Sequence, residues 1–182
     1  MTTLTIPGYQ TGTWDIDPVH SDVSFTVVHL GLTRYRRSFE RFGGEITTTA
    51  DPLRSSVTAQ VDITSFDTGL EKFNQHLLAD GFFAADRYPS AQFRSTGLRT
   101  YEERYVLEGE LTLRGVTRPV IFDLELHGFG DGINGESKVA FSAETIIRRA
   151  DFGITFDATL PGGGLVVGND VRIALEVEAV RR

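Results

Sequence analysis

Apolar and polar residues alternate through residues 104–126, where two such runs meet at a short connection. The apolar phase of the two runs consists of Leu107, Gly109, Leu111 and Leu113, then Val120, Phe122, Leu124 and Leu126. A period of two is typical of strands with one apolar face and one face in water. The Gly-Val-Thr-Arg-Pro link at residues 115–119 is short, which predicts that the two strands are antiparallel neighbours.

The same period recurs along nearly the whole chain. Further alternating segments lie at residues 14–16, 22–30, 35–48, 57–63, 91–95, 139–147 and 171–179. Turn signals separate several of them, notably at residues 50–52, 128–135 and 161–169. We therefore expect an all-β fold with about eight antiparallel strands curled around an apolar interior. It should form a single domain over residues 12–182, after a loose lead-in at residues 1–11.

One segment follows a helical period instead. Between Gly69 and Gly81, the residues Leu70, Phe73, Leu77 and Leu78 recur at the spacing of a helix face, and Phe82-Phe83 follow. A short amphipathic helix in a strand-rich chain must lay its apolar stripe on another element. We expect it to close one end of the barrel. It either covers the core there or gates an interior cavity.

Charge and cysteine content exclude several classes of function. The formal net charge is −7, which argues against a nucleic-acid partner because such domains are basic. There is no cysteine, so disulfides and thiolate catalysis are excluded. The first ten residues show no signal-peptide pattern, and no apolar stretch approaches the roughly 18 residues of a membrane span. The expected location is cytoplasmic.

Four fragments, in order along residues 12–180, resemble the YceI-like family. They are His20 to Gly31; Asp67-Thr68 with His76-Leu77, Phe82-Phe83, Tyr88-Pro89 and Phe93; Gly109 to Val120; and Arg149 to Ile154. The resemblance implies a lipocalin-like barrel that binds polyisoprenoid lipids, and it suggests a possible homodimer. Two positions depart from the family pattern. Phe73-Asn74 stands where the family usually has Arg-Asp, and Ser38 where it usually has Gly. Any head-group role of the missing charge pair cannot be carried over.

An isoprenoid tail would need an apolar lining, which the inner phase of the strands can supply. About fifteen buried carbons would contribute on the order of 12 kcal/mol before ordering costs. The candidate ligand-binding residues are Phe25, Val27, His29, Phe73, His76, Leu77, Phe82, Phe93, Leu111, Leu113, Phe122, Leu124 and Phe141, with Ala59, Val61 and Ala143 as further wall residues. The same alternation also describes a barrel packed solid with its own side chains.

The polar candidates have alternative interpretations. His29 either meets a ligand head group or is a core histidine bonded to a backbone carbonyl or an aspartate, and we favour the second. His76 is expected at the cavity mouth. Arg34, Arg36, Arg37 and Arg41 form a basic cluster that either holds a diphosphate or, as we favour, covers a solvated strand face.

The sequence thus predicts a non-enzymatic carrier whose ligand is a long-chain isoprenoid, either a polyprenyl diphosphate or the tail of a quinone. The alternatives are an enzyme acting on a lipid-like substrate in the same pocket, and a solid barrel acting as an interaction module. Neither His-Glu-x-x-His nor His-x-His occurs. We therefore expect no catalytic residues, no metal and no cofactor.

Overall fold

The computed structural model describes residues 5–182, in which ten strands and one α-helix are joined by loops and three short 3-10 helices. The strands are β1 (Gly12–Ile16), β2 (Asp22–His29), β3 (Thr33–Phe39), β4 (Phe42–Thr48), β5 (Ser56–Asp62), β6 (Ser90–Tyr101), β7 (Arg104–Leu113), β8 (Val116–Asp131), β9 (Ser137–Arg148) and β10 (Val167–Arg181). The helices are α1 (Glu71–Leu78), η1 (Pro52–Arg54), η2 (Ile63–Ser65) and η3 (Arg149–Phe152). No helix in this range is long and apolar enough to cross a membrane.

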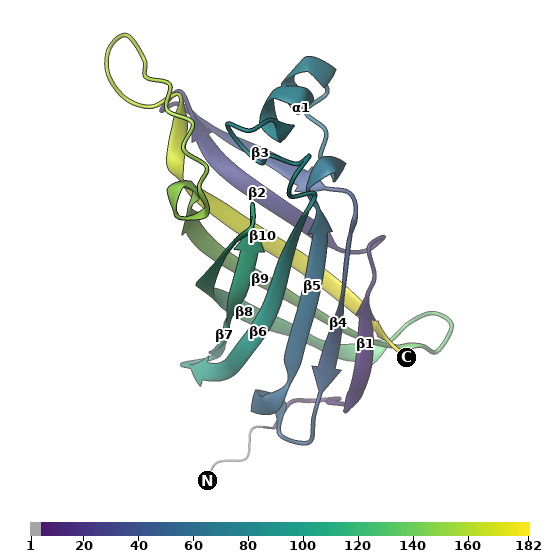
Figure 1. The fold of residues 1–182 in the computed structure, drawn as a ribbon. Coiled ribbons are helices and arrows are strands. Elements are labelled where there is room, and N and C mark those ends of the chain that lie inside the picture. The colour runs from purple at the N-terminus through teal and green to yellow at the C-terminus, as the bar shows by residue number, and fades with distance from the viewer. Residues whose placement is uncertain (1–4) are drawn as a thin grey trace.

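Eight strands close into an antiparallel ring. Their order is β1-β4-β5-β6-β7-β8-β9-β10, and the ring closes because β1 also pairs with β10, with Trp14 opposite Arg181. The hairpin of β2 and β3 continues the wall at one end, where β2 pairs with the first part of β10 (Figure 1). Between Thr33 and Ser38, the outer edge of β3 has no strand partner in the part of the chain that the structure describes. The predicted all-β barrel of about eight strands is confirmed.

The link between β7 and β8 is tighter than the sequence indicates. Only Arg114 and Gly115 connect the strands, and both have positive φ, +53° and +71°. Positive φ at both central residues is typical of a type I′ turn, which suits the twist of a hairpin. Pro119, expected in the link, instead lies in β8 opposite Glu110. The expected boundary was wrong because arginine rarely adopts the left-handed conformation and so gives no turn signal.

A buried tryptophan closes one end of the barrel, called here the Trp14 end. Trp14 is fully buried, and its Nε1–H donates to Thr48 Oγ1 at 2.8 Å. The lead-in is held against this end rather than loose, because the Tyr9 hydroxyl donates to the Thr49 carbonyl at 2.8 Å and the Tyr9 ring packs on Phe129. Residues 1–4 of the lead-in lie outside the described residues.

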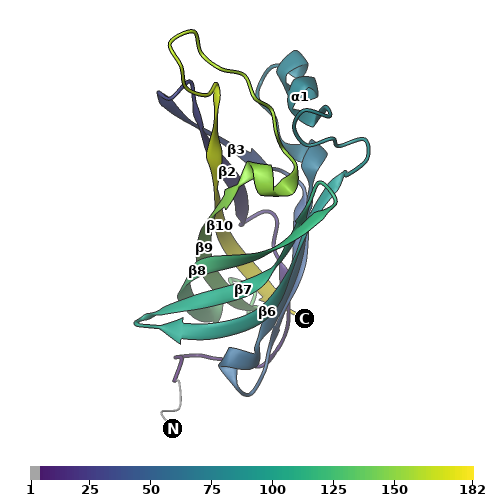
Figure 2. The same cartoon turned by 60° about the vertical axis from the view of Figure 1, so that its left-hand side comes forward.

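Helix α1 lies at the opposite end, called here the helix end, where the loop of residues 153–166 also rises (Figure 2). The helix confirms the element predicted within residues 69–81, although it is shorter, and none of its residues is buried. Leu70 was expected on its apolar stripe. It instead precedes the first helical residue and is 62% exposed, because the chain turns at Gly69 with φ of +80°.

Candidate functional site

The barrel encloses an apolar cavity of about 340 Å³. Its wall is made mainly by the inward phase of the strands, as the period of two predicts, and by aromatic residues at the helix end. On β10 the lining residues run from Val167 to Val177, about 33 Å along the strand. The volume lies in the range of small-molecule sites, which is roughly 300–1,000 Å³. A narrow, elongated apolar chain therefore fits the shape and chemistry of this space.

Many inward apolar side chains are only half buried, although they lie on the inner face of the barrel. Phe25, Ile173 and Leu175 belong to this group, and all three line the cavity. A protein interior is normally filled to the density of an organic crystal. These side chains lack partners on one side because the void is there. The alternative of a barrel packed solid is therefore not what the structure has.

The structure brings eleven of the thirteen predicted ligand-binding residues to this cavity. These are Phe25, Val27, His29, Phe73, Leu77, Phe82, Phe93, Leu111, Leu113, Phe122 and Phe141, together with the wall residues Ala59, Val61 and Ala143. Their contact with a ligand stays a prediction.

Leu124 and His76 lie elsewhere. Leu124 lines a second, smaller cavity of about 100 Å³ near Tyr9, because Leu107 and Phe141 stand between the two spaces and line both. His76 was expected at the cavity mouth. It is exposed on α1, with its ring 5.2 Å from that of Phe82 and stacked at 6.4 Å on Phe73.

Aromatic side chains close the cavity at the helix end. Phe73 of α1 meets Tyr35 of β3 with ring centroids 6.1 Å apart, and this contact crosses the unpaired edge of β3. Phe83 packs edge-on against Phe25 at 6.2 Å, and Phe82 stacks on Phe156 at 4.6 Å. The helix end is thus closed by side chains from α1 and the segment after it, rather than by a continuous ladder of strands.

Three residues with polar side chains border the cavity at the helix end, although the cavity surface itself is almost entirely apolar. His29 is one of them, is half buried and lines the cavity, and the role of its ring stays a prediction. The Tyr35 hydroxyl is buried without a partner within residues 5–182, and burial raises the pKa of this hydroxyl. Arg149 is 5% exposed and borders the same space.

Sequence reasoning missed Tyr35 and Arg149 as cavity residues. Tyr35 lies in the irregular run at residues 35–48, where the alternating phase is hard to assign. Arg149 lies in the fragment Arg149 to Ile154 that supports the family resemblance, but no role was assigned to it. Three other polar residues border the cavity without offering a free group inside: Ser24 donates to the Ala174 carbonyl at 3.2 Å, and Gln60 and Gln92 are exposed.

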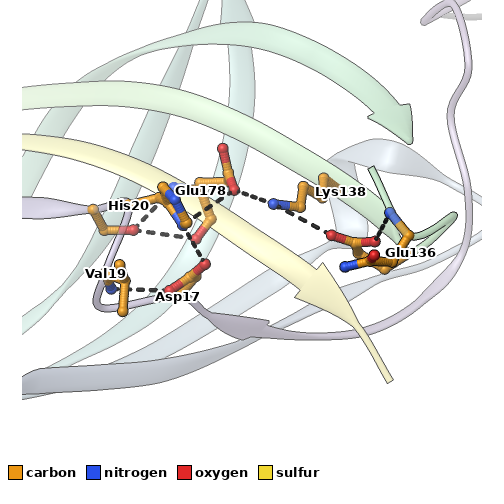
Figure 3. Close-up of polar contacts among 8 residues, drawn as sticks. Asp17, Val19, His20, Glu136, Lys138 and Glu178 are labelled. Atoms are coloured by element: carbon orange, nitrogen blue, oxygen red, sulfur yellow. Dashed lines mark hydrogen bonds and ion pairs between the residues drawn. The ribbon is translucent and has the colours of Figure 1, made fainter. Parts of the chain in front are cut away.

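A separate polar cluster lies outside the cavity, where β1 bends into β2 (Figure 3). Within the described residues, Asp17, His20 and Glu178 are the one group spaced to hold a metal ion. The carboxylates of this group already have partners within the protein. His20 Nδ1 lies 2.7 Å from Asp17 Oδ2, and Lys138 Nζ lies 2.6 Å from Glu178 Oε1.

The charges of this cluster stabilise contacts between strands. The hydrogen bonds from His20 and the Val19 N–H hold the pKa of Asp17 below its ordinary value. The Glu178 carboxylate raises the pKa of Lys138. The cluster therefore fastens the β1–β2 bend to β10 and β9 rather than forming an open ligand site.

Comparisons with known proteins agree with this fold. A family model described as "YceI-like domain" matches residues 14–179. A UPF0312 protein of Photorhabdus laumondii is 35% identical over 144 residues, which cover 79% of this chain and 75% of that protein.

Two solved structures share the architecture. BcnA of Burkholderia cenocepacia superposes with a TM-score of 0.77 at 21% identity, over 90% of this chain and 98% of that one. A polyisoprenoid binding domain from Saccharophagus degradans superposes with a TM-score of 0.71 at 15% identity, over 95% of this chain and all of that one. At these identities the structural likeness shows the fold alone.

Proposed function

The chain belongs to the family of YceI-like domains, and from this premise we propose that it is a non-enzymatic carrier of an isoprenoid-type lipid. The observation that carries the proposal is the elongated apolar cavity of about 340 Å³. A domain of the same fold from Saccharophagus degradans is named for polyisoprenoid binding, which supports the same class of ligand. The ligand would be a polyprenyl diphosphate or a quinone held by its tail.

The apolar lining is sufficient for useful affinity. Each methylene that leaves water for an apolar site contributes roughly 0.8 kcal/mol. About ten carbons in the cavity would contribute about 8 kcal/mol, which corresponds to micromolar affinity before ordering costs. The lining thus favours a long apolar tail over a compact polar substrate.

Native mass spectrometry, combined with organic extraction, tests the proposal directly. The purified chain should carry a mass adduct that organic solvent releases as an intact lipid, and delipidated protein should regain an adduct from added geranylgeraniol. Failure to take up this probe would contradict the carrier function. Conversion of the probe to a product of different mass would instead favour the enzyme that the sequence left open.

The compartment and the oligomeric state expected from the sequence stay predictions. Cell fractionation tests the cytoplasmic location. Light scattering after size exclusion tests the homodimer, whose mass should be twice the 20.1 kDa of the chain.

A further inference from the structure

The turn between β2 and β3 exposes apolar side chains at the helix end, beside the loop of residues 153–166 (Figure 2). Val28, Leu30 and Leu32 alternate along the chain here, and all three are exposed, Leu32 by 83%. They are called here the apolar tip. Single exposed apolar residues are ordinary, whereas several gathered at one turn indicate a contact site.

The backbone of this turn is unusual for the residues that form it. Leu30 and Gly31 both have positive φ, +56° and +68°. The left-handed region suits glycine, asparagine and aspartate, and it is uncommon for leucine. Leu30 gains nothing from the interior in return, because it is exposed and does not line the cavity. The stability of the fold therefore does not account for a leucine at this position.

The same hairpin is basic, although the chain as a whole is acidic. Its arginines are Arg34, Arg36 and Arg37, called here the hairpin arginines. They stand against one carboxylate, Asp22, between residues 22 and 39, whereas the whole chain has a formal net charge of −7. Asp22 pairs with Arg36 at 2.9 Å, and neither of the other two arginines has an ion pair within residues 5–182. Two cations therefore remain available to an external anion.

The spacing of the apolar and basic groups suits the interface of a lipid bilayer. Arg34 and Arg36 follow Leu32 by two and four residues, which places their backbones about 7 and 13 Å from it along the strand. Apolar groups of peripheral proteins enter the boundary between lipid heads and chains by roughly 5–10 Å. Long arginine side chains can then reach the lipid phosphates while their stems cover apolar surface.

Other segments at the helix end are acidic. Asp67, Glu71 and Asp80 lie in and around α1, and Asp157 lies in the loop of residues 153–166. An anionic surface repels these carboxylates and attracts the hairpin arginines, so the molecule would approach such a surface with the hairpin first.

The turn between β8 and β9 provides an internal comparison. It also exposes an apolar side chain, since Ile133 is fully exposed, but the nearby charges are the carboxylates of Asp131 and Glu136. Apolar exposure is thus shared by both turns, whereas positive charge belongs to the β2–β3 hairpin.

We propose that the β2–β3 hairpin is a docking surface for an anionic lipid bilayer. The apolar tip enters the apolar layer, and the hairpin arginines contact the phosphate groups. The tip adjoins the cavity, because the Leu30 N–H donates to the Val166 carbonyl at 2.8 Å and the neighbouring residues His29 and Val167 line that space. Docking would hold the cavity at the membrane surface. This inference goes beyond the proposed carrier function, and it can be tested without an isoprenoid.

Vesicle co-sedimentation of the full chain tests the proposal. Vesicles of phosphatidylcholine that also contain phosphatidylglycerol should bind the chain at least tenfold more tightly than vesicles of phosphatidylcholine alone. Each cation near an anionic surface contributes about fivefold in affinity, and the chain's net negative charge offsets part of this gain. Binding should weaken as salt is raised, because ions screen these charges.

Two pairs of variants separate the apolar contact from the charge. Leu32→Ser should weaken binding to the anionic vesicles about tenfold, because a leucine side chain no longer leaves water, whereas Ile133→Ser should leave it unchanged. Arg34→Gln should weaken it about fivefold, whereas Arg54→Gln, at an exposed arginine of η1, should not. All four side chains are exposed, so Tm should stay the same in every variant and serves as the control for folding.

Several outcomes would overturn the docking surface. The first is a native chain that binds neither kind of vesicle while it still takes up geranylgeraniol in solution, which would leave the carrier function intact. The second is equal loss of binding in Leu32→Ser and Ile133→Ser, which would mean unspecific adhesion. The third is binding to soluble polyglutamate but not to anionic vesicles, which would assign the hairpin arginines to an acidic protein instead.

Discussion

Replacing Val171 by phenylalanine should separate the cavity from an ordinary core. Val171 lies on β10, is half buried and faces the void, opposite Val27 of β2 and Ile147 of β9. In a closely packed core a larger side chain costs about 1–3 kcal/mol because neighbours must move. At Val171 the added ring can enter space that the protein leaves empty.

The expected loss of affinity follows from the atoms involved. Phenylalanine has about four more side-chain carbons than valine, and each ligand carbon displaced loses roughly 0.8 kcal/mol of transfer free energy. Four displaced carbons amount to about 3 kcal/mol, or about 200-fold in the dissociation constant. The Tm of the lipid-free variant should stay within about 2 °C of the native value or rise, because filling a void removes its cost.

Titration with geranylgeraniol gives the affinity, and thermal unfolding of the lipid-free protein gives Tm. Val28→Phe is the matched control, because Val28 is 42% exposed, does not line the cavity and lies in the neighbouring strand. It should change neither quantity. The reasoning is refuted if Val171→Phe lowers Tm by more than about 5 °C while affinity per folded molecule is unchanged, since Val171 would then be packed core and the lipid would bind elsewhere.

Three further changes test other parts of the structure. Phe73→Asp places a charge in the apolar closure, so lipid affinity should fall about tenfold or more while Tm changes little; a fall in Tm alone would make α1 a mere cover. Gly109→Ala should lower Tm by about 3–10 °C in thermal unfolding, because the new Cβ would overlap the Phe93 ring and lie 2.7 Å from the Arg94 carbonyl; an unchanged Tm would contradict this contact. Asp17 has a lowered pKa, so its hydrogen bond with His20 stabilises the fold above pH about 4 and is lost as pH falls through the folded value. Asp17→Asn should therefore lower Tm at neutral pH, and the difference in Tm between the native protein and the variant should disappear in acid. A difference that does not change with pH would show that it does not come from the ionised Asp17 carboxylate.

The alternating pattern predicted the lining because the pleat of a strand fixes which side chains point inward. The alternating pattern does not specify how far along the barrel axis a side chain lies. Phe122 and Leu124 share one phase of β8, yet they line different cavities because Leu107 and Phe141, from other strands, divide the interior. Period therefore identifies a face, whereas the position along the barrel depends on the pairing of distant strands.

The place of Arg149 beside the cavity lay beyond local pattern for the same reason. Arg149 donates to the carbonyl of Val167, which lies opposite His29 only because β2 pairs with β10. His76 shows how far the sequence predicts the direction in which a side chain of the helix points. Eight residues make about two turns, so small changes in where the helix begins turn a side chain from the cavity to the solvent.

The unpaired edge of β3 bears on how the molecule avoids self-association. A bare strand edge is a template on which another chain can add a strand and begin aggregation. Arg34, Arg36 and Arg37 occupy this edge strand, and only Arg36 pairs with a carboxylate among the described residues. Two copies joined antiparallel through β3 would bring these arginines face to face, and such like-charge pairs are destabilising. Arg34, Arg36 and Arg37 therefore disfavour the addition of a second copy along β3, and this effect requires no ligand.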